Sequence, residues 1–211
     1  MINDEILREY DIRGIYGSSL KKNDIISIAD SISSIIIDNK MLEIIIGHDG
    51  RDSSLEIKNL LISSMNNNGV NVIDISLVPT PLCYYATHKL NIPNSIMITG
   101  SHNPQEYNGF KFIINNEPFY GEQIKNLNNI KIKDNSEKIG LLKHVNIVST
   151  YLSEIPNKLN IKKDLKIAWD IGNGVVGSMF HSILKKIPGN HIVINSSVDG
   201  NFPNHHPDPT V

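Results

Sequence analysis

Apolar residues follow two different spacings along the first part of the chain. Over residues 24–39 they recur every three or four positions, which places them on one face of an α-helix, and Asp24 is expected to cap its start. Residues 43–47 form a short β-branched run that ends in glycine, which is typical of a strand buried on both faces. The same patterns continue and predict helices over 53–67, 82–90 and 120–129, and strands over 70–77, 95–99 and 110–114.

The alternation restarts beyond a polar stretch at residues 131–143, which is interpreted as a connector. It then predicts a helix over 149–159, a strand over 166–170, a glycine-rich turn at 171–174, a helix over 175–186 and a strand over 191–195. One strand–helix–strand unit buries little surface alone, so this part is expected to be the beginning of a domain. We therefore predict an α/β fold, with a layered α/β domain around a mostly parallel mixed sheet over residues 1–143 and a partial second α/β domain over residues 144–211.

The composition narrows the function classes. A formal net charge of −2, with no basic run longer than two residues, provides no field for nucleic acid or for an anionic membrane surface. No apolar run approaches the ~20 residues of a membrane span, and the acidic N-terminus does not resemble a signal peptide. Cys83 is the single cysteine, so no intramolecular disulfide can form, and a small buried hydrophobe is expected there. These features predict a cytoplasmic protein without a nucleic-acid or membrane partner.

One polar loop carries candidate chemistry. Ser101 follows a predicted strand whose end lies at the carboxyl edge of the sheet, where α/β proteins place ligands. Gly100 permits a close backbone approach or a positive φ, and His102 and Asn103 can donate hydrogen bonds. A serine hydrolase would have glycine two residues after its nucleophile, but Asn103 stands there. The residues alone leave open whether this is a reactive loop or an ordinary turn.

Four motifs in this order resemble the α-D-phosphohexomutase family, which contains phosphoglucomutases and phosphomannomutases. They are Arg-Glu-Tyr-Asp-Ile-Arg-Gly at 8–14, Thr-Gly-Ser-His-Asn-Pro at 99–104 continuing as Tyr-Asn-Gly-Phe-Lys at 107–111, Asp-Ile-Gly-Asn-Gly at 170–174, and Asp-Gly-Asn-Phe-Pro at 199–203 continuing as His-Pro-Asp-Pro at 206–209. The likeness runs from Arg8 to the end of the chain. It implies a phosphoserine loop around Ser101.

The resemblance implies an isomerase of carbohydrate metabolism that interconverts hexose 1-phosphate and hexose 6-phosphate. In this family a serine is phosphorylated in the resting enzyme, donates its phosphoryl group to the sugar phosphate, and is rephosphorylated by the 1,6-bisphosphate intermediate. Ser101 stands at that position. Because serine is a weak nucleophile at neutral pH, it needs a base or electrostatic help.

The resemblance also assigns roles to residues around Ser101. Arg13 and Lys111 match family positions beside the phosphoserine and are expected, with His102, to take part in catalysis. An arginine fork suits phosphate oxygens, and lysine is a compact charge. The substrate-binding residues are expected to be Tyr10, Arg13, His102, Asn103 and Lys111. Mg²⁺ is expected to bind Ser101 through its phosphate.

Part of the family's site has no counterpart in this sequence. Complete members have four domains, and the Asp-Gly-Asp-x-Asp loop that supplies their other Mg²⁺ ligands does not occur in the 211 residues. The expected partners are a hexose phosphate, a hexose 1,6-bisphosphate and the missing C-terminal domains, in the same or another chain. The chain alone is expected to be inactive as a mutase. The alternatives are a truncated non-catalytic remnant acting as a binding or assembly module, and a chain in which Ser101 is phosphorylated without turnover.

Three smaller motifs have less specific interpretations. Asp49 and Arg51 resemble the family's Asp-x-Arg loop and are interpreted as a structural pair. The adjacent histidines at 205–206, in a proline-rich loop, are weak support for a metal site. Gly172 and Gly174 could cradle a phosphate, but the third glycine of a dinucleotide site is absent.

Overall fold

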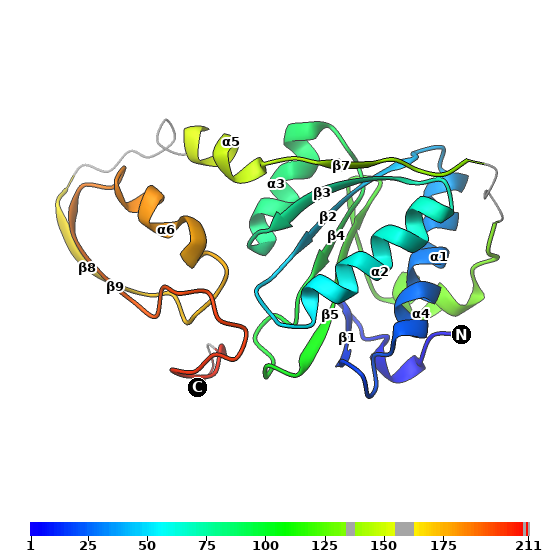
Figure 1. Ribbon diagram of the computed structural model, residues 1–211, viewed down its shortest axis with the longest axis horizontal. Coiled ribbons are helices and arrows are strands. Elements are labelled where there is room, and N and C mark those ends of the chain that lie inside the picture. Colours follow the sequence, from blue (N-terminus) through cyan, green and yellow to red (C-terminus); the bar gives the residue numbers. More distant parts are fainter. Residues whose placement is uncertain (134–137, 155–162, 209, 211) are drawn as a thin grey trace.

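The computed structural model describes residues 1–133, 138–154, 163–208 and 210. Figure 1 shows a larger layered unit and a smaller unit beyond α5. The helices are α1 (Lys22–Asp38), α2 (Ser54–Asn67), α3 (Thr80–Leu90), α4 (Glu122–Lys125), α5 (Ile147–Glu154) and α6 (Gly177–Leu184), with 3-10 turns at Asp4–Ile6 and Asn126–Asn129. The strands are β1 (Ile12–Ile15), β2 (Glu43–His48), β3 (Asn71–Leu77), β4 (Ser95–Ile98), β5 (Tyr107–Ile114), β6 (Glu117–Phe119), β7 (Leu142–His144), β8 (Leu165–Asp170) and β9 (Gly189–Ile194).

The large sheet is mixed, as the sequence predicts. Its strands lie in the order β1-β5-β4-β2-β3-β7, and β6 pairs with β5. The strands β4, β2, β3 and β7 are parallel neighbours, whereas β5 runs antiparallel to β1, β4 and β6. Because parallel strands end at the same edge, the loops after β2 and β4 bring Asp49 and Ser101 to one side of the sheet.

Strand β2 shows how the sheet is buried on both faces. Its residues Ile44, Ile45 and Ile46 are all fully buried. Ile44 and Ile46 belong to a core with side chains of α1 and α2, while Ile45 belongs to a core with side chains of α3. The helices α1 and α2 therefore cover one face and α3 the other (Figure 1). Each fully buried isoleucine contributes about 1.5–3 kcal/mol of transfer free energy.

The α3 core also joins the two units. It includes Cys83, Ile147 of α5 and Met179 of α6, so the smaller unit packs on the α3 side of the sheet. Cys83 is fully buried, as predicted, and burial raises the pKa of its thiol to about 12. In the smaller unit, β8 and β9 pair in parallel and are connected through α6. No helix within the described ranges is long and apolar enough to cross a membrane.

The structure corrects several predicted elements: the helix expected over 120–129 is α4 followed by a 3-10 turn, and the strand expected over 110–114 begins at Tyr107. Helix α1 begins earlier than expected, with Lys21 as the N-cap, and the Asp24 carboxylate accepts a hydrogen bond from the backbone N of Lys21 at 2.8 Å. The prediction that Asp24 is the cap is therefore wrong, because this residue closes a capping box from the third position. The interpretation of 131–143 as a connector is partly wrong, because β7 starts at Leu142 and extends the sheet. Residues 134–137 of that stretch, and the predicted helix end at 155–159, lie outside the described residues.

Candidate active site

The Ser101 loop connects two antiparallel strands, β4 and β5, and needs unusual backbone geometry. Ser101 itself has a positive φ of 54°, a left-handed conformation that few non-glycine residues adopt. Gly100 serves a different purpose. A Cβ added to it would lie 2.4 Å from the Arg51 Cζ and 2.6 Å from the carbonyl oxygen of Tyr107. Of the two reasons that the sequence offers for Gly100, close approach is therefore the one that the structure supports.

The left-handed turn changes how Ser101 and His102 face each other. An extended backbone would point these neighbouring side chains apart. In the structure both are exposed, and the Ser101 Oγ lies 3.4 Å from the His102 Nδ1. This separation is long for a hydrogen bond from a hydroxyl, but it keeps the imidazole beside the nucleophile candidate.

Arg51 holds the loop through its main-chain carbonyls. Its guanidinium donates to the carbonyl oxygens of Ser101, Asn103, Pro104 and Tyr107 over 2.5–3.0 Å. Its Nε lies 3.2 Å from the Asp49 carboxylate, which confirms the predicted structural pair. Burial lowers the pKa of the Arg51 guanidinium, while the Asp49 carboxylate acts in the opposite direction. One buried side chain thus ties together four carbonyls of an irregular loop, whose backbone groups have few regular partners.

A second cationic group approaches the loop from β1 and β5. The Arg13 Nη1 donates to the carbonyl oxygen of Gly100 at 2.9 Å, and its Nη2 forms an ion pair with Asp11. The Lys111 Nζ lies 2.8 Å from the same Asp11 carboxylate. Asp11 therefore joins the two predicted cations, a role that the sequence analysis did not assign. The motif contained the signal, because residues two apart in an extended segment share a face.

Arg13 and Lys111 both keep capacity to interact with a ligand. The Arg13 Nε is buried and has no hydrogen-bond partner within the described ranges. The Lys111 side chain remains about a quarter exposed, at 26%. Since a buried unpaired donor is costly, the Arg13 Nε–H is suited to donate a hydrogen bond to an oxygen of a ligand.

The remaining predicted residues are placed differently. The Asn103 side-chain oxygen accepts a hydrogen bond from the Arg13 guanidinium, so Asn103 is already engaged in holding the loop. Tyr10 is 75% exposed, and its ring stacks on Tyr120 at a centroid distance of 6.5 Å. Asn103 thus stands beside Arg13, whereas the Tyr10 ring contacts Tyr120, directly after β6.

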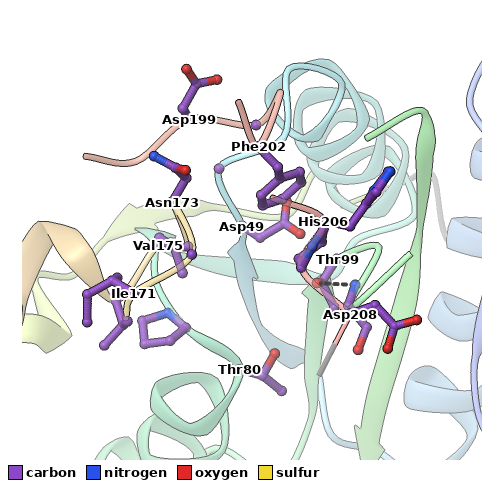
Figure 2. Close-up of a pocket in the computed structure, with 18 of the residues that line it drawn as sticks. Asp49, Thr80, Thr99, Ile171, Asn173, Val175, Asp199, Phe202, His206 and Asp208 are labelled. Carbon is purple, nitrogen blue, oxygen red and sulfur yellow. Dashed lines mark hydrogen bonds between the residues drawn. The ribbon is translucent and has the colours of Figure 1, made fainter. Parts of the chain in front are cut away.

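A cavity of about 490 Å³ separates the Ser101 loop from the smaller unit (Figure 2). Its walls are the loops after β2 and β4, the glycine-rich turn after β8 and the segment 199–208. Among the described lining residues, Ser101 is the one predicted site residue. The dashed line at Thr99 in Figure 2 is the hydrogen bond from the backbone N of Ser101, 2.9 Å long.

The far wall of the cavity carries a carboxylate–imidazole pair. The His205 Nε2 lies 2.9 Å from the Asp170 Oδ2, and the other Asp170 oxygen accepts from the backbone N of Gly172 and the amide of Asn195. The hydrogen bond from Asn195, followed by that from Gly172, lowers the pKa of Asp170. The hydrogen bond to the His206 carbonyl, followed by the Asp170 carboxylate, raises the pKa of His205.

The described side chains at this cavity do not by themselves provide the Mg²⁺ site that the resemblance implies. Within the described parts of the chain, no group of three or more histidine, cysteine, aspartate or glutamate side chains is placed to hold a metal ion. The donors present at the cavity therefore do not form a complete Mg²⁺ site.

Two family models match the chain in succession. Residues 4–139 match phosphoglucomutase/phosphomannomutase, alpha/beta/alpha domain I, and residues 149–211 match alpha/beta/alpha domain II. A phosphomannomutase/phosphoglucomutase of Pseudomonas syringae is 37% identical over 210 residues, which are 99% of this chain and 45% of that protein. A phosphoglucomutase of Neisseria meningitidis is 35% identical over 209 residues, which are 98% of this chain and 45% of that protein.

Solved structures agree with the sequence matches. A phosphoglucomutase/phosphomannomutase family protein of Burkholderia thailandensis superposes with a TM-score of 0.91 at 31% identity, covering all of this chain and 48% of that one. The chain thus spans about half the length of the relatives that it matches. Because the two family models cover almost all of its residues in the expected order, the chain belongs to the phosphoglucomutase/phosphomannomutase family.

Proposed function

We propose that this chain supplies the phosphoserine loop of a phosphohexomutase that interconverts hexose 1-phosphate and hexose 6-phosphate, with Ser101 carrying the phosphoryl group. The observation that carries this proposal is the position of Ser101. Its hydroxyl is exposed beside a cavity, on a loop held by Arg51 and contacted by Arg13, and Asp11 links Arg13 to Lys111. Phosphoryl transfer depends chiefly on such positioning and on neutralising the charge of the phosphoryl oxygens.

In the proposed transfer, a sugar hydroxyl oxygen attacks the phosphorus on Ser101. A bond from phosphorus to the sugar oxygen forms while the bond from phosphorus to the Ser101 Oγ breaks. The proton lost by the sugar hydroxyl is regained, in the net reaction, by the Ser101 hydroxyl. Arg13 and Lys111 stabilise the charge on the transferring group, and the His102 imidazole, 3.4 Å from the Oγ, steadies the phosphate. Reversal with the other phosphate of the 1,6-bisphosphate regenerates the phosphoserine.

The same proposal extends to the substrate-binding residues of this chain and to the parts of the site that other domains supply. Tyr10 and Asn103 join Arg13, His102 and Lys111 in binding the hexose phosphate. The phosphate on Ser101 would serve as one ligand of Mg²⁺, which would supply charge neutralisation there, with the remaining ligands coming from domains beyond the two matched here. We divide the chain at residues 1–143 and 144–211, a boundary that falls within β7, and place the activity in the cytoplasm. The finding that the chain spans about half the length of its relatives supports the view that turnover needs the rest of the protein.

A coupled assay of mutase turnover tests this proposal. Glucose 1-phosphate and mannose 1-phosphate are supplied with Mg²⁺ and a trace of the 1,6-bisphosphate, using the 211-residue chain and the full-length gene product. We expect no turnover by the chain alone, because nothing holds the far end of the substrate. We expect turnover by a product that includes the further domains, and its near abolition by Ser101→Ala.

The matched control is Ser153→Ala, which removes an exposed serine hydroxyl from α5 and is expected to leave turnover at the wild-type level. Turnover that survives Ser101→Ala at the wild-type rate would contradict the assignment of Ser101. Turnover by the chain alone, lost in Ser101→Ala, would contradict the need for further domains while supporting the serine.

A further inference from the structure

The segment 198–202 of the smaller unit lies directly on the residues that hold the Ser101 loop. A Cβ added to Gly200 would lie 2.6 Å from the carbonyl oxygen of Gly50 and 2.7 Å from the Cα of Arg51. A Cβ added to Gly50 would lie 2.5 Å from the Cγ1 of Val198. At Gly200 the two backbones therefore approach so closely that glycine is needed, and at Gly50 a side chain would press on the Val198 methyl group.

Phe202 completes this contact on the guanidinium itself. The Arg51 Cζ lies 5.1 Å from the centroid of the Phe202 ring, within the range of a cation–π interaction. The edges of the guanidinium donate to the carbonyls of the Ser101 loop and to Asp49, so its open face is the surface that Phe202 takes. Phe202 also has a positive φ of 50°, which a bulky residue keeps only where its surroundings impose it.

We propose that Phe202 and Gly200 are positioning residues that couple the smaller unit to the Ser101 loop through Arg51. When 198–202 is seated, the Phe202 ring fixes the plane of the guanidinium, and the fixed guanidinium holds the four carbonyls in register. When the segment lifts, Arg51 gains freedom and the loop around Ser101 opens more often. The phosphate-carrying role of the loop rests on the proposed function, but the coupling itself is a property of the fold.

The aromatic face, and not bulk alone, is the feature that this coupling requires. Phe202→Leu keeps an apolar side chain of similar reach but removes the π-face that attracts the guanidinium. Phe202→Trp keeps and strengthens that face. The two variants therefore separate a specific contact with Arg51 from simple filling of the gap between the units.

Hydrogen–deuterium exchange of the whole chain measures the effect without any assay of activity. The reporters are the backbone amides of Gly100, Ser101, Asn103 and Tyr107, each of which donates a hydrogen bond at or next to the loop. We expect these amides to exchange about fivefold faster in Phe202→Leu, from a lost cation–π contact of ordinary strength. We expect the loop amides to be as protected from exchange in Phe202→Trp as in the wild type. In Gly200→Ala we expect a greater loss of protection than in Phe202→Leu, because the added Cβ cannot fit against Gly50.

The control variant is Asn201→Ala, because Asn201 is exposed and its side-chain amide donates to Asp199 in its own segment. It should leave the loop amides unchanged. Equal exchange in Phe202→Leu and wild type, or equal losses in the leucine and tryptophan variants, would overturn the proposal. So would faster exchange spread through α6 as much as through the loop, because that result would indicate general loosening of the smaller unit.

The same variants also separate this inference from the proposed function. Each is incubated with glucose 1,6-bisphosphate, and the phosphate added to Ser101 is followed by intact mass. If the wild-type chain takes up no phosphate, the proposed function is contradicted for this chain, while the exchange result still decides the coupling. If it does, we expect slower uptake in Phe202→Leu than in Phe202→Trp.

Discussion

The two units of the molecule differ in how completely they bury their strands. In the larger unit, Ile44, Ile45 and Ile46 of β2 are all 0% exposed. In the smaller unit, Ile192 and Ile194 of β9 are 67% and 48% exposed. In the larger unit, Ser101 and its neighbouring cations thus lie at the edge of a sheet whose central isoleucines are fully buried. The smaller unit lines the cavity with turns that follow less completely buried strands. The position of these turns depends on contacts with the larger unit.

Ion pairs also differ in burial between the interior of the larger unit and its contact with the smaller one. Removing a buried pair is expected to have the largest effect on stability. The Lys58 Nζ lies 2.7 Å from the Asp74 carboxylate in the larger unit, and Asp74 is 1% exposed. Lys58→Met would leave this carboxylate buried without its main counter-charge. We expect the free energy of unfolding to fall by about 3–5 kcal/mol, measured by urea denaturation followed by circular dichroism.

The matched variant is Lys89→Met, which removes one of the partners of Glu154 between α3 and α5. The Lys89 side chain is 42% exposed, so the expected loss is below about 1 kcal/mol. A loss at Lys89 as large as that at Lys58 would show that the contacts between the units contribute as much as the interior of the larger one.

Buried and exposed isoleucines sharpen the comparison next. Ile45→Ala removes a fully buried side chain from the centre of the sheet, and we expect a loss of about 2–5 kcal/mol. Ile192→Ala removes the same atoms from an exposed position on β9, and we expect a change within about 0.5 kcal/mol. Urea denaturation of both variants checks this. A cost of several kcal/mol at Ile192 would mean that the β9 face is covered in solution.

The smallest effect is a pH dependence of the Asp170–His205 pair. A raised pKa of His205 means that its contribution to stability is complete below its ordinary value of 6.5 and is lost as pH rises through the raised value. A lowered pKa of Asp170 means that its contribution is present above its ordinary value of 3.8 and is lost as pH falls through the lowered value. The pair therefore stabilises the turn most at mildly acidic pH.

Urea midpoints of wild type and His205→Ala, compared from about pH 5 to about pH 8, test this interpretation. We expect a small difference at the acidic end that disappears at the basic end. His181→Ala, which removes an exposed imidazole from α6, is the control and should show no such trend. A difference that grows with rising pH would contradict the pairing.

The periodic segments of this fold could be predicted from the sequence, and the short ones could not. Helix α2 and strand β2 each carry a full pattern of apolar positions, and both were expected within one residue of their bounds. The three residues of β7 and of β6 have no period to recognise, because their pairing partners alone make them strands. Asp24 was misplaced because an aspartate near a helix start can be the N-cap itself or, as here, accept from the N-cap backbone N at the third helical position.

The candidate site was predictable where a motif encodes it and less so where tertiary contacts build it. The loop around Ser101 and the nearness of Arg13 followed from the family resemblance. The left-handed φ of Ser101 did not, because non-glycine residues seldom adopt it. Arg51 was expected to pair with Asp49, but its four carbonyl contacts depend on how the loop folds back. Phe202 lies about 150 residues away from Arg51 in the chain and meets it only through the packing of the units.

The central claim is that Ser101 carries the phosphoryl group, and site-resolved mass spectrometry tests it most directly. The purified chain and its Ser101→Ala variant are incubated with glucose 1,6-bisphosphate, and their peptides are sequenced by fragmentation. We predict one added phosphate on Ser101 in the wild type and none in the variant. Phosphate on another residue, or an equal mass increase in Ser101→Ala, would contradict the account.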